Sequence, residues 1–249
     1  METPKKKLCS RPLKKQSGAI GGRMGLLNGT GTFVENLLYT LPAVLISLSF
    51  HEFGHAYAAY KNGDPTARNE GRMTLNPLAH IDIFGFIMMI LVGYGWAKPV
   101  PVNPRKYRNY KKGEITVSLA GVTMNLILAF VGALAFSIVL AVSGKQEVWT
   151  NAISKSLNLL SYFVLINCSL TVFNLLPIYP LDGFHVAETL LAPRIGYKPF
   201  LFLRRYGYYV LIGLMMLSRT GSFSLVGIAS TAIYKLLIKI TMAIAGLFA

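Results

Sequence analysis

Cysteine and acidic side chains are scarce in this sequence of 249 residues. Its two cysteines, Cys9 and Cys168, form no CxxC pair and no framework, which excludes a disulfide scaffold and a cysteine metal site. Asp and Glu number 10 against 25 Lys and Arg, so the formal net charge is +15 at pH 7. Any site that needs a carboxylate therefore has few candidates to draw on.

Charge as a whole is also scarce, because charged residues make up 14% of the chain and hydrophobic residues 53%. The mean hydropathy of +0.48 is too high for an ordinary soluble domain. The basic residues lie between long apolar runs rather than along one polar face, which argues against a nucleic-acid partner. This composition predicts a membrane protein with basic loops, whose partner is the lipid bilayer.

Long apolar runs predict an all-α polytopic membrane protein with about five to six transmembrane helices, since a spanning helix needs roughly 20 mainly apolar residues. Five runs are long enough, at 34–60, 114–142, 152–176, 199–217 and 223–248. The first 30 residues are basic and then Gly-rich, so we expect a flexible tail over 1–30 with no cleavable signal. Residues 31–249 are expected to form a single membrane-embedded domain.

A sixth apolar run, at 81–96, is shorter and holds three glycines. We expect it either to span the membrane or to form a re-entrant segment that enters and leaves on the same side. A re-entrant segment is possible only where protein or water covers its backbone. GWAKPVPV at 95–102 is either a proline-rich connector or a short extended edge that pairs with an unwound substrate.

The first long run ends in HEFGH, residues 51–55. On a helix, His51 and His55 lie one above the other, so both imidazoles reach one metal ion. Glu52 lies about 100° round the helix from His51 and can touch a metal-activated water without being a ligand. Ionisable side chains at bilayer depth are costly and are rarely kept without a function. The pattern therefore predicts a zinc hydrolase in which Glu52 is the general base.

A catalytic zinc site needs a third protein ligand, and Asp182 is the leading candidate. It follows the run at 152–176, and Pro177, Pro180 and Gly183 around it break the helix. His185 and Glu188 are the alternatives, and a plain loop aspartate is the simplest reading of Asp182.

Loop charges predict how the helices are oriented. The loop at 98–112 carries six Lys and Arg residues, whereas 143–151 carries Lys145 against Glu147, so the first loop is expected in the cytoplasm and the second outside. The basic tail argues for a cytoplasmic start. If His51 and Asp182 form one site, however, both must lie near the cytoplasmic end of their segments, and the first helix must then run from outside to inside. We give this geometric requirement precedence over the charge of the tail, because charge bias is only statistical.

HEFGH and the distant NLLPIYPLDG together resemble the site-2 protease family of zinc intramembrane metalloproteases. HEFGHAYAAYKNGDPTARNEGRMTLNPLAHID and GWAKPVPVNPRKY are similar to its compact subgroup without regulatory domains, and the resemblance covers about residues 40–215. It implies one zinc ion per chain, with His51, His55 and Asp182 as ligands and Glu52 as the base. It also implies a multi-pass protein of the cell membrane that cuts a transmembrane segment of another protein.

The resemblance also extends to two asparagines that would bind or orient the substrate. Asn174 opens NLLPIYPLDG, and Asn125 closes AGVTMN, which matches the Gly-Pro-x-x-Asn motif of the family. Val122 stands where that motif has proline, which weakens the transfer to Asn125. The simpler reading is that each amide hydrogen-bonds a neighbouring helix.

Two other functions fit parts of the pattern. A metal-ion transporter or channel could use the His/Asp cluster as a permeation site. A permeation path needs several polar side chains along its length, however, and the other helices offer mostly single amides and hydroxyls. An inactive relative would bind membrane proteins without cutting them. Such a relative is expected to lose Glu52 or a ligand, and this chain keeps all four residues.

Overall fold

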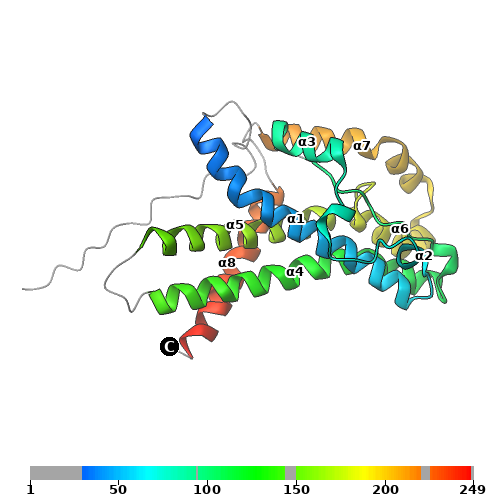
Figure 1. The fold of residues 1–249 in the computed structure, drawn as a ribbon. Coiled ribbons are helices and arrows are strands. Elements are labelled where there is room, and N and C mark those ends of the chain that lie inside the picture. Colours follow the sequence, from blue (N-terminus) through cyan, green and yellow to red (C-terminus); the bar gives the residue numbers. More distant parts are fainter. Residues whose placement is uncertain (1–29, 94, 144–149, 220–224, 248–249) are drawn as a thin grey trace, which may run out of the picture.

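The computed structural model describes residues 30–93, 95–143, 150–219 and 225–247, so the predicted tail lies almost wholly outside the described residues. Within these ranges the regular structure is helical (Figure 1). The long helices are α1 (Thr30–Lys61), α4 (Tyr110–Ser143), α5 (Asn151–Asn174), α7 (Lys198–Arg219) and α8 (Leu225–Gly246). The shorter ones are α2 (Thr66–Asn69), η2 (Pro77–Ala79), α3 (Ile83–Val92), η3 (Pro104–Lys106) and α6 (Asp182–Ile195).

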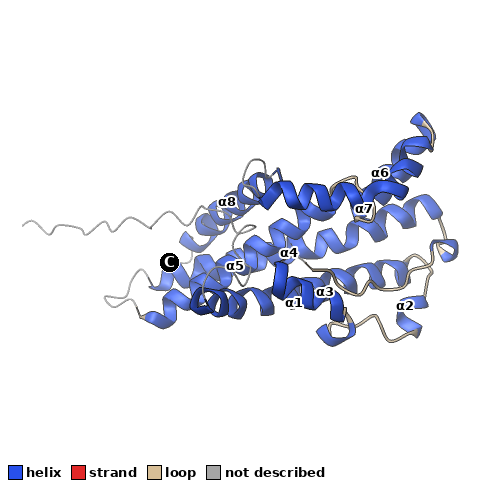
Figure 2. Cartoon of the chain, turned by 90° about the horizontal axis from the view of Figure 1, so that it is seen from above, coloured by secondary structure: helices blue, strands red, loops and turns tan. Residues whose placement is uncertain are grey.

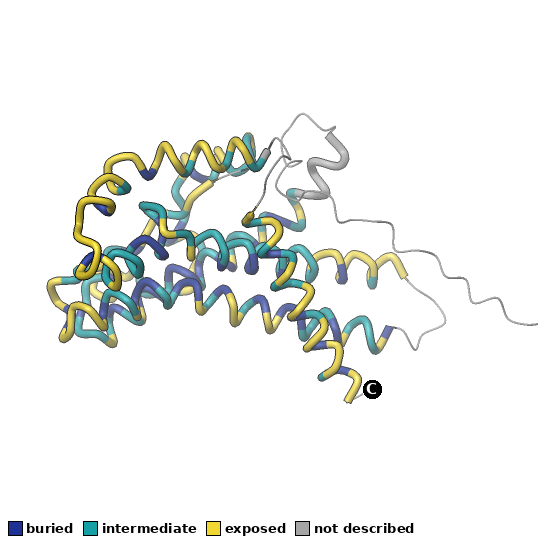
Figure 3. The backbone as a smooth tube through the Cα atoms, turned by 180° about the vertical axis from the view of Figure 1, so that it is seen from behind, coloured by how far each residue is buried: buried dark blue, intermediate teal, exposed yellow. Residues whose placement is uncertain are grey.

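Five of these helices are long and apolar enough to cross a membrane, which confirms the predicted all-α polytopic fold. The spanning stretches are Leu37–Lys61, Tyr110–Ser143, Asn151–Asn174, Lys198–Ser218 and Leu225–Gly246. Each overlaps most of one of the five long apolar runs in the sequence. The burial pattern agrees, because large apolar side chains stay exposed along the outer faces of these helices, above all on α7 (Figure 3).

Helix α4 packs against α1, α5, α6 and α8, and it runs alongside α5 and α1 (Figures 1 and 2). Small residues allow this packing, since lipid offers no hydrophobic drive between helices and close backbone approach must supply the contact. Ala129 and Ala133 of α4 meet Val164 and Cys168 of α5 in one buried cluster.

The crossing of α1 and α4 is equally close. A Cβ atom added to Gly54 on α1 would lie 2.9 Å from the Ala120 carbonyl oxygen on α4. Near the end of α1, the Asn62 amide donates to Thr116 Oγ1 at 2.9 Å. The two helices therefore run antiparallel, and their contact places the HEFGH motif against the first half of α4.

The short apolar run at 81–96 does not span. Its helix α3 has 10 residues and rises about 15 Å, half of the roughly 30 Å hydrocarbon core. It begins where the Asp82 carboxylate accepts a hydrogen bond from Gly85 N and ends at Gly93, whose φ is 82°. The two ends meet, because Ile81 and Ala97 form an antiparallel bridge and Lys98 N donates to His80 O at 2.8 Å. The segment thus leaves and returns at one end of the bundle.

The possible edge at 95–102 forms no strand beyond this bridge in the part of the chain that the structure describes. Its backbone groups are used within the protein. Arg72 Nη2 donates to Lys98 O at 2.9 Å and to Pro99 O at 3.2 Å, and Val100 N donates to Glu52. A substrate strand that paired here would have to displace these bonds, which favours the connector interpretation.

Asp64 ties the turn after α1 to the loop before α4. Its side chain is fully buried, and it accepts hydrogen bonds from Thr66 N at 3.0 Å, Thr66 Oγ1 and Asn103 N at 2.6 Å, with Lys106 Nζ at 3.9 Å. Burial alone would raise the pKa of this carboxyl, but these donors and the lysine charge outweigh it and hold the pKa below its ordinary value.

Replacing Asp64 with Asn is expected to destabilise the fold by about 1–3 kcal/mol at pH 7, because buried donors lose a charged acceptor. The pKa is lower in the folded state, so the ionised carboxyl stabilises the fold above its ordinary pKa of 3.8. This stability is lost as the pH falls through the folded-state pKa. Thermal unfolding measures this effect. The unfolding temperatures of the parent and of Asp64→Asn should differ less at pH 3 than at pH 7.

Asp82→Asn is the matched control for this change, since asparagine caps a helix about as well as aspartate. It should unfold close to the parent at both pH values. An Asp64→Asn variant that also unfolds like the parent at pH 7 would contradict the role assigned to Asp64.

Candidate metal centre

His51 and His55 lie one helical turn apart on α1, are almost entirely buried, and point their Nε2 atoms at a common point. These two atoms are 3.0 Å apart, and the rings meet edge to face. His55 Nδ1 lies 2.8 Å from the Val117 carbonyl oxygen on α4. Because a carbonyl can only accept, His55 Nδ1 carries a proton, and Nε2 is the ring atom that is left to bind a metal.

Asp182 brings the third donor from the start of α6. Its Oδ2 lies 3.3 Å from His51 Nε2, and its Oδ1 lies 3.4 Å from His55 Nε2. Two ligands about 2.05 Å from a tetrahedral zinc ion are separated by about 3.3 Å. The 3.0 Å between the two imidazole nitrogens and the 3.3 Å from His51 Nε2 to Asp182 Oδ2 are close to this separation, and one donor atom from each of the three residues lies within 4.8 Å of the others. Asp182 Oδ2 is also buried without a hydrogen bond of good geometry, as befits a metal ligand.

Asp182 places a carboxylate beside the two imidazole nitrogens. The donor set of two imidazoles and one carboxylate therefore fits zinc in charge, chemistry and spacing.

The local backbone at the start of α6 fixes the position of Asp182. Helix α5 ends before Pro177 and Pro180, and the short turn that follows is closed by a hydrogen bond from Leu181 N to Ile178 O at 2.9 Å. A Cβ atom added to Gly183 would lie 2.2 Å from the Leu175 carbonyl oxygen. Only glycine lets α6 start this close to the end of α5.

Gly121 on α4 leaves room for the cluster. A Cβ atom there would lie 2.5 Å from His55 Nε2 and 2.7 Å from His51 Nε2. The missing side chain thus opens the space in which the three donors converge. The sequence holds this glycine inside AGVTMN, but the spacing of the motif alone does not show which side chains it faces.

Glu52 is buried beside this cluster. Its Oε2 accepts a hydrogen bond from Val100 N at 2.8 Å, across 48 residues of sequence. Its Oε1 makes no hydrogen bond within the described residues. One carboxylate oxygen is therefore held in place, and the other is free to take a proton.

The structure separates the alternative third ligands from the cluster. His185 Nδ1 lies 3.3 Å from Glu114 Oε1, which docks α6 on α4. Glu188 receives two hydrogen bonds from Arg204 on α7, at 3.1 and 2.6 Å. Both side chains have partners of their own, and neither joins the group of donor atoms formed by His51, His55 and Asp182.

The two candidate asparagines differ in their surroundings. Asn174 donates to Leu170 O at 3.0 Å in its own helix rather than to a neighbouring helix. Asn125 lies one turn beyond Gly121 on α4, is fully buried, and neither polar atom of its side chain has a hydrogen-bond partner. A buried amide without partners is costly. Asn125 thus offers a free donor and acceptor close to the cluster, and Asn174 does not.

Comparisons with known proteins agree with this chemistry. The family model of peptidase family M50 matches residues 39–218. YwhC of Bacillus subtilis, which is named as a zinc metalloprotease, is 39% identical over 188 residues that make up 75% of this chain and 84% of YwhC. Rip2 of Mycolicibacterium smegmatis, also named as one, is 27% identical over 190 residues, 74% of this chain and 69% of Rip2.

A more distant relative is the zinc metalloprotease MJ0392 of Methanocaldococcus jannaschii, which is 25% identical over 154 residues, 62% of this chain and 34% of that protein. No solved structure matches the chain significantly. The family match covers well over half of the sequence and includes all the residues of the cluster. The chain therefore belongs to peptidase family M50, the site-2 proteases, and is a zinc metallopeptidase that crosses the membrane several times.

Proposed function

We propose that this metallopeptidase cuts peptide bonds within or next to the transmembrane segments of other proteins in the cell membrane, and that residues 31–249 act as one peptidase domain. The depth of the cluster is the observation that carries the proposal. His51 and His55 lie ten and six residues before the end of the spanning stretch Leu37–Lys61. At a rise of 1.5 Å per residue, they sit about 9–15 Å inside that end.

His51, His55 and Asp182 would hold one zinc ion per chain. The zinc ion, when bound, supplies Lewis acidity that polarises a carbonyl and makes water acidic near neutral pH. Glu52 Oε1 takes the proton of the attacking water and gives it to the leaving amine, while Val100 N keeps the carboxylate in place.

The asparagines would act on the substrate rather than on the metal. Asn125 Nδ2 can donate to the scissile carbonyl or to the backbone beside it, since it has no partner within the protein. Asn174 would act only after it leaves its bond to Leu170 O, so its part in substrate binding is the weaker one.

A membrane substrate must unwind before hydrolysis, because helical peptide bonds are shielded by their own hydrogen bonds. Glycine and proline lower the cost of this unwinding. A substrate span with a Gly-Pro pair should therefore be cut faster than one of leucine alone.

The test uses the purified protein in proteoliposomes with two single-pass reporters that differ only in their spans, one of leucine alone and one with a central Gly-Pro pair. Mass spectrometry of the products maps the cut. We expect cleavage inside or beside the span, at least about 10-fold faster for the Gly-Pro reporter. Cleavage confined to the soluble part of the reporter, at equal rates for both, would contradict the proposal.

The transporter alternative gains no support from these findings. The cluster belongs to a chain of a peptidase family, and Glu52 is placed as a base beside the histidines rather than as a ligand between them.

A further inference from the structure

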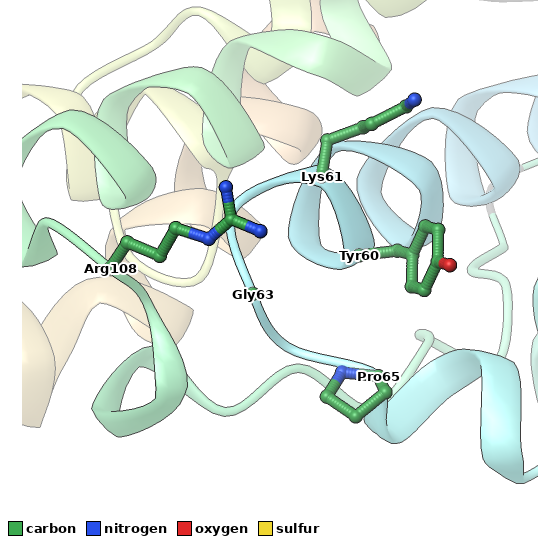
Figure 4. A pocket seen from close by; sticks show the side chains of 5 residues that line it. All are labelled: Tyr60, Lys61, Gly63, Pro65 and Arg108. Atoms are coloured by element: carbon green, nitrogen blue, oxygen red, sulfur yellow. The ribbon is translucent and has the colours of Figure 1, made fainter.

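A basic hollow lies at the end of α1, apart from the metal centre. It has a volume of about 460 Å³ and is lined by Tyr60, Lys61, Gly63, Pro65 and Arg108 (Figure 4). This volume falls in the range of about 300–1,000 Å³ that ligand sites occupy. We name it the Arg108 pocket. In Figure 4 the Arg108 side chain reaches toward the turn at Gly63, with Tyr60 and Pro65 across the hollow.

The pocket lies at the level where two spans leave the membrane. Lys61 is the last residue of the spanning stretch of α1, and Arg108 lies two residues before Tyr110, where the spanning stretch of α4 begins. The polar headgroups of lipids occupy this level. The pocket therefore opens where a lipid phosphate is an immediate neighbour.

The two cations of the pocket have no anion within the described residues. Lys61 Nζ lies over the Tyr57 ring, 5.4 Å from its centroid, and the Arg108 guanidinium makes neither an ion pair nor a hydrogen bond. The nearby Asp64 is turned inward and held by its own donors. The pocket thus presents positive charge that the protein itself does not neutralise.

The walls of the pocket are held in place by other contacts. The Arg68 guanidinium stacks on the Tyr60 ring at 4.7 Å and donates to its hydroxyl. Arg108 N donates to Asn62 O at 2.8 Å, which fixes the backbone below the guanidinium. Gly63 has a φ of 106°, and a Cβ there would lie 3.2 Å from Arg108 Cγ. A site held this way loses little conformational freedom on binding.

We propose that the Arg108 pocket binds the phosphate group of an anionic phospholipid. A guanidinium grips phosphate with two parallel hydrogen bonds, and the flexible lysine adds a point charge. By the positive-inside rule, the basic loop at 98–112 predicts that this end of the bundle faces the cytoplasm, where the leaflet is rich in anionic lipids. Lys61 points away from Arg108 in Figure 4 and would have to turn from the Tyr57 ring to share a phosphate with it. Such a phosphate would bridge the end of α1 and the start of α4, the two helices that meet at the metal centre.

The test measures phosphatidylglycerol binding to the full-length protein by native mass spectrometry, and thermal unfolding in phosphatidylglycerol or phosphatidylcholine nanodiscs. The parent should bind phosphatidylglycerol and unfold at a higher temperature in the anionic discs. The double change Lys61→Ala and Arg108→Ala should weaken phosphatidylglycerol binding about 25-fold, about fivefold for each cation lost, and remove the rise in unfolding temperature.

The matched control, Lys111→Ala with Lys112→Ala, removes the same charge from exposed positions on the first turn of α4 and should keep both the binding and the shift. The zinc content of each variant in phosphatidylcholine discs reports whether it is folded. If the pocket variant is less stable there, Arg108→Lys supplies the test, with binding weakened because the paired hydrogen bonds are lost.

Three results would overturn the proposal. The pocket variants could bind phosphatidylglycerol like the parent, or the Lys111/Lys112 control could lose as much as the pocket variant, which would indicate a diffuse charge effect. Inorganic phosphate alone could raise the unfolding temperature as much in phosphatidylcholine discs, which would make free phosphate the ligand in place of a lipid.

Discussion

Replacing Glu52 with Gln is expected to slow peptide hydrolysis by about 10²–10⁴-fold while zinc stays bound. The amide has the shape of the carboxylate, and its oxygen can still accept the hydrogen bond from Val100 N, so the site should keep its structure. It cannot take a proton from water, however, and the general base is lost. Reporter cleavage tests the loss of hydrolysis, and zinc content measured on the same sample tests whether the metal stays bound.

Glu70→Gln is the matched control, because it makes the same chemical change at an exposed loop position. It should cleave at the parent rate. A Glu52→Gln variant that cleaves like the parent would show that another group is the base, and one that loses its zinc would show that Glu52 is a ligand.

Gly121→Ala has the second large expected effect, on zinc affinity. The added methyl group would lie 2.5 Å from His55 Nε2 and 2.7 Å from His51 Nε2, so the imidazoles must move away from their common point. Displacing ligands in this way should lower zinc affinity by about 10–100-fold or more, with a matching loss of cleavage. The helix itself should not suffer, since alanine favours helix over glycine by about 1 kcal/mol.

Competition with a chelator measures this zinc affinity. Gly213→Ala is the control, because a Cβ at this position on α7 meets nothing within 4 Å. It should bind zinc and cleave like the parent. Parent-like affinity in Gly121→Ala would mean that the space beside the imidazoles is not needed for the metal.

The sequence predicts the side chains of this site better than the backbone groups that hold them. His51, Glu52 and His55 can be proposed because their spacing puts both imidazoles on one helix face in a run where idle ionisable groups are costly, and Asp182 because prolines and a glycine mark a break at its position. Val100 N and Val117 O hold Glu52 and His55 across 48 and 62 residues. Any residue type can supply such a backbone group, so no sequence pattern reveals it.

The same limit explains the apolar run at 81–96. Its length falls between that of a span and that of a short helix, and its glycines fit either one. The bond from Lys98 N to His80 O, which returns the chain to its starting end, depends on tertiary contacts. The five long runs carry no such ambiguity, because only a helix satisfies the backbone of so many apolar residues in lipid.

Zinc content per chain, measured by elemental analysis on detergent-purified protein, is the most direct test of the central claim. We expect about one zinc ion in the parent and in His185→Ala, whose side chain pairs with Glu114, and loss of zinc in His51→Ala, His55→Ala and Asp182→Ala. If Asp182→Ala keeps its zinc at parent affinity, or His185→Ala loses it, the proposed ligand set is wrong.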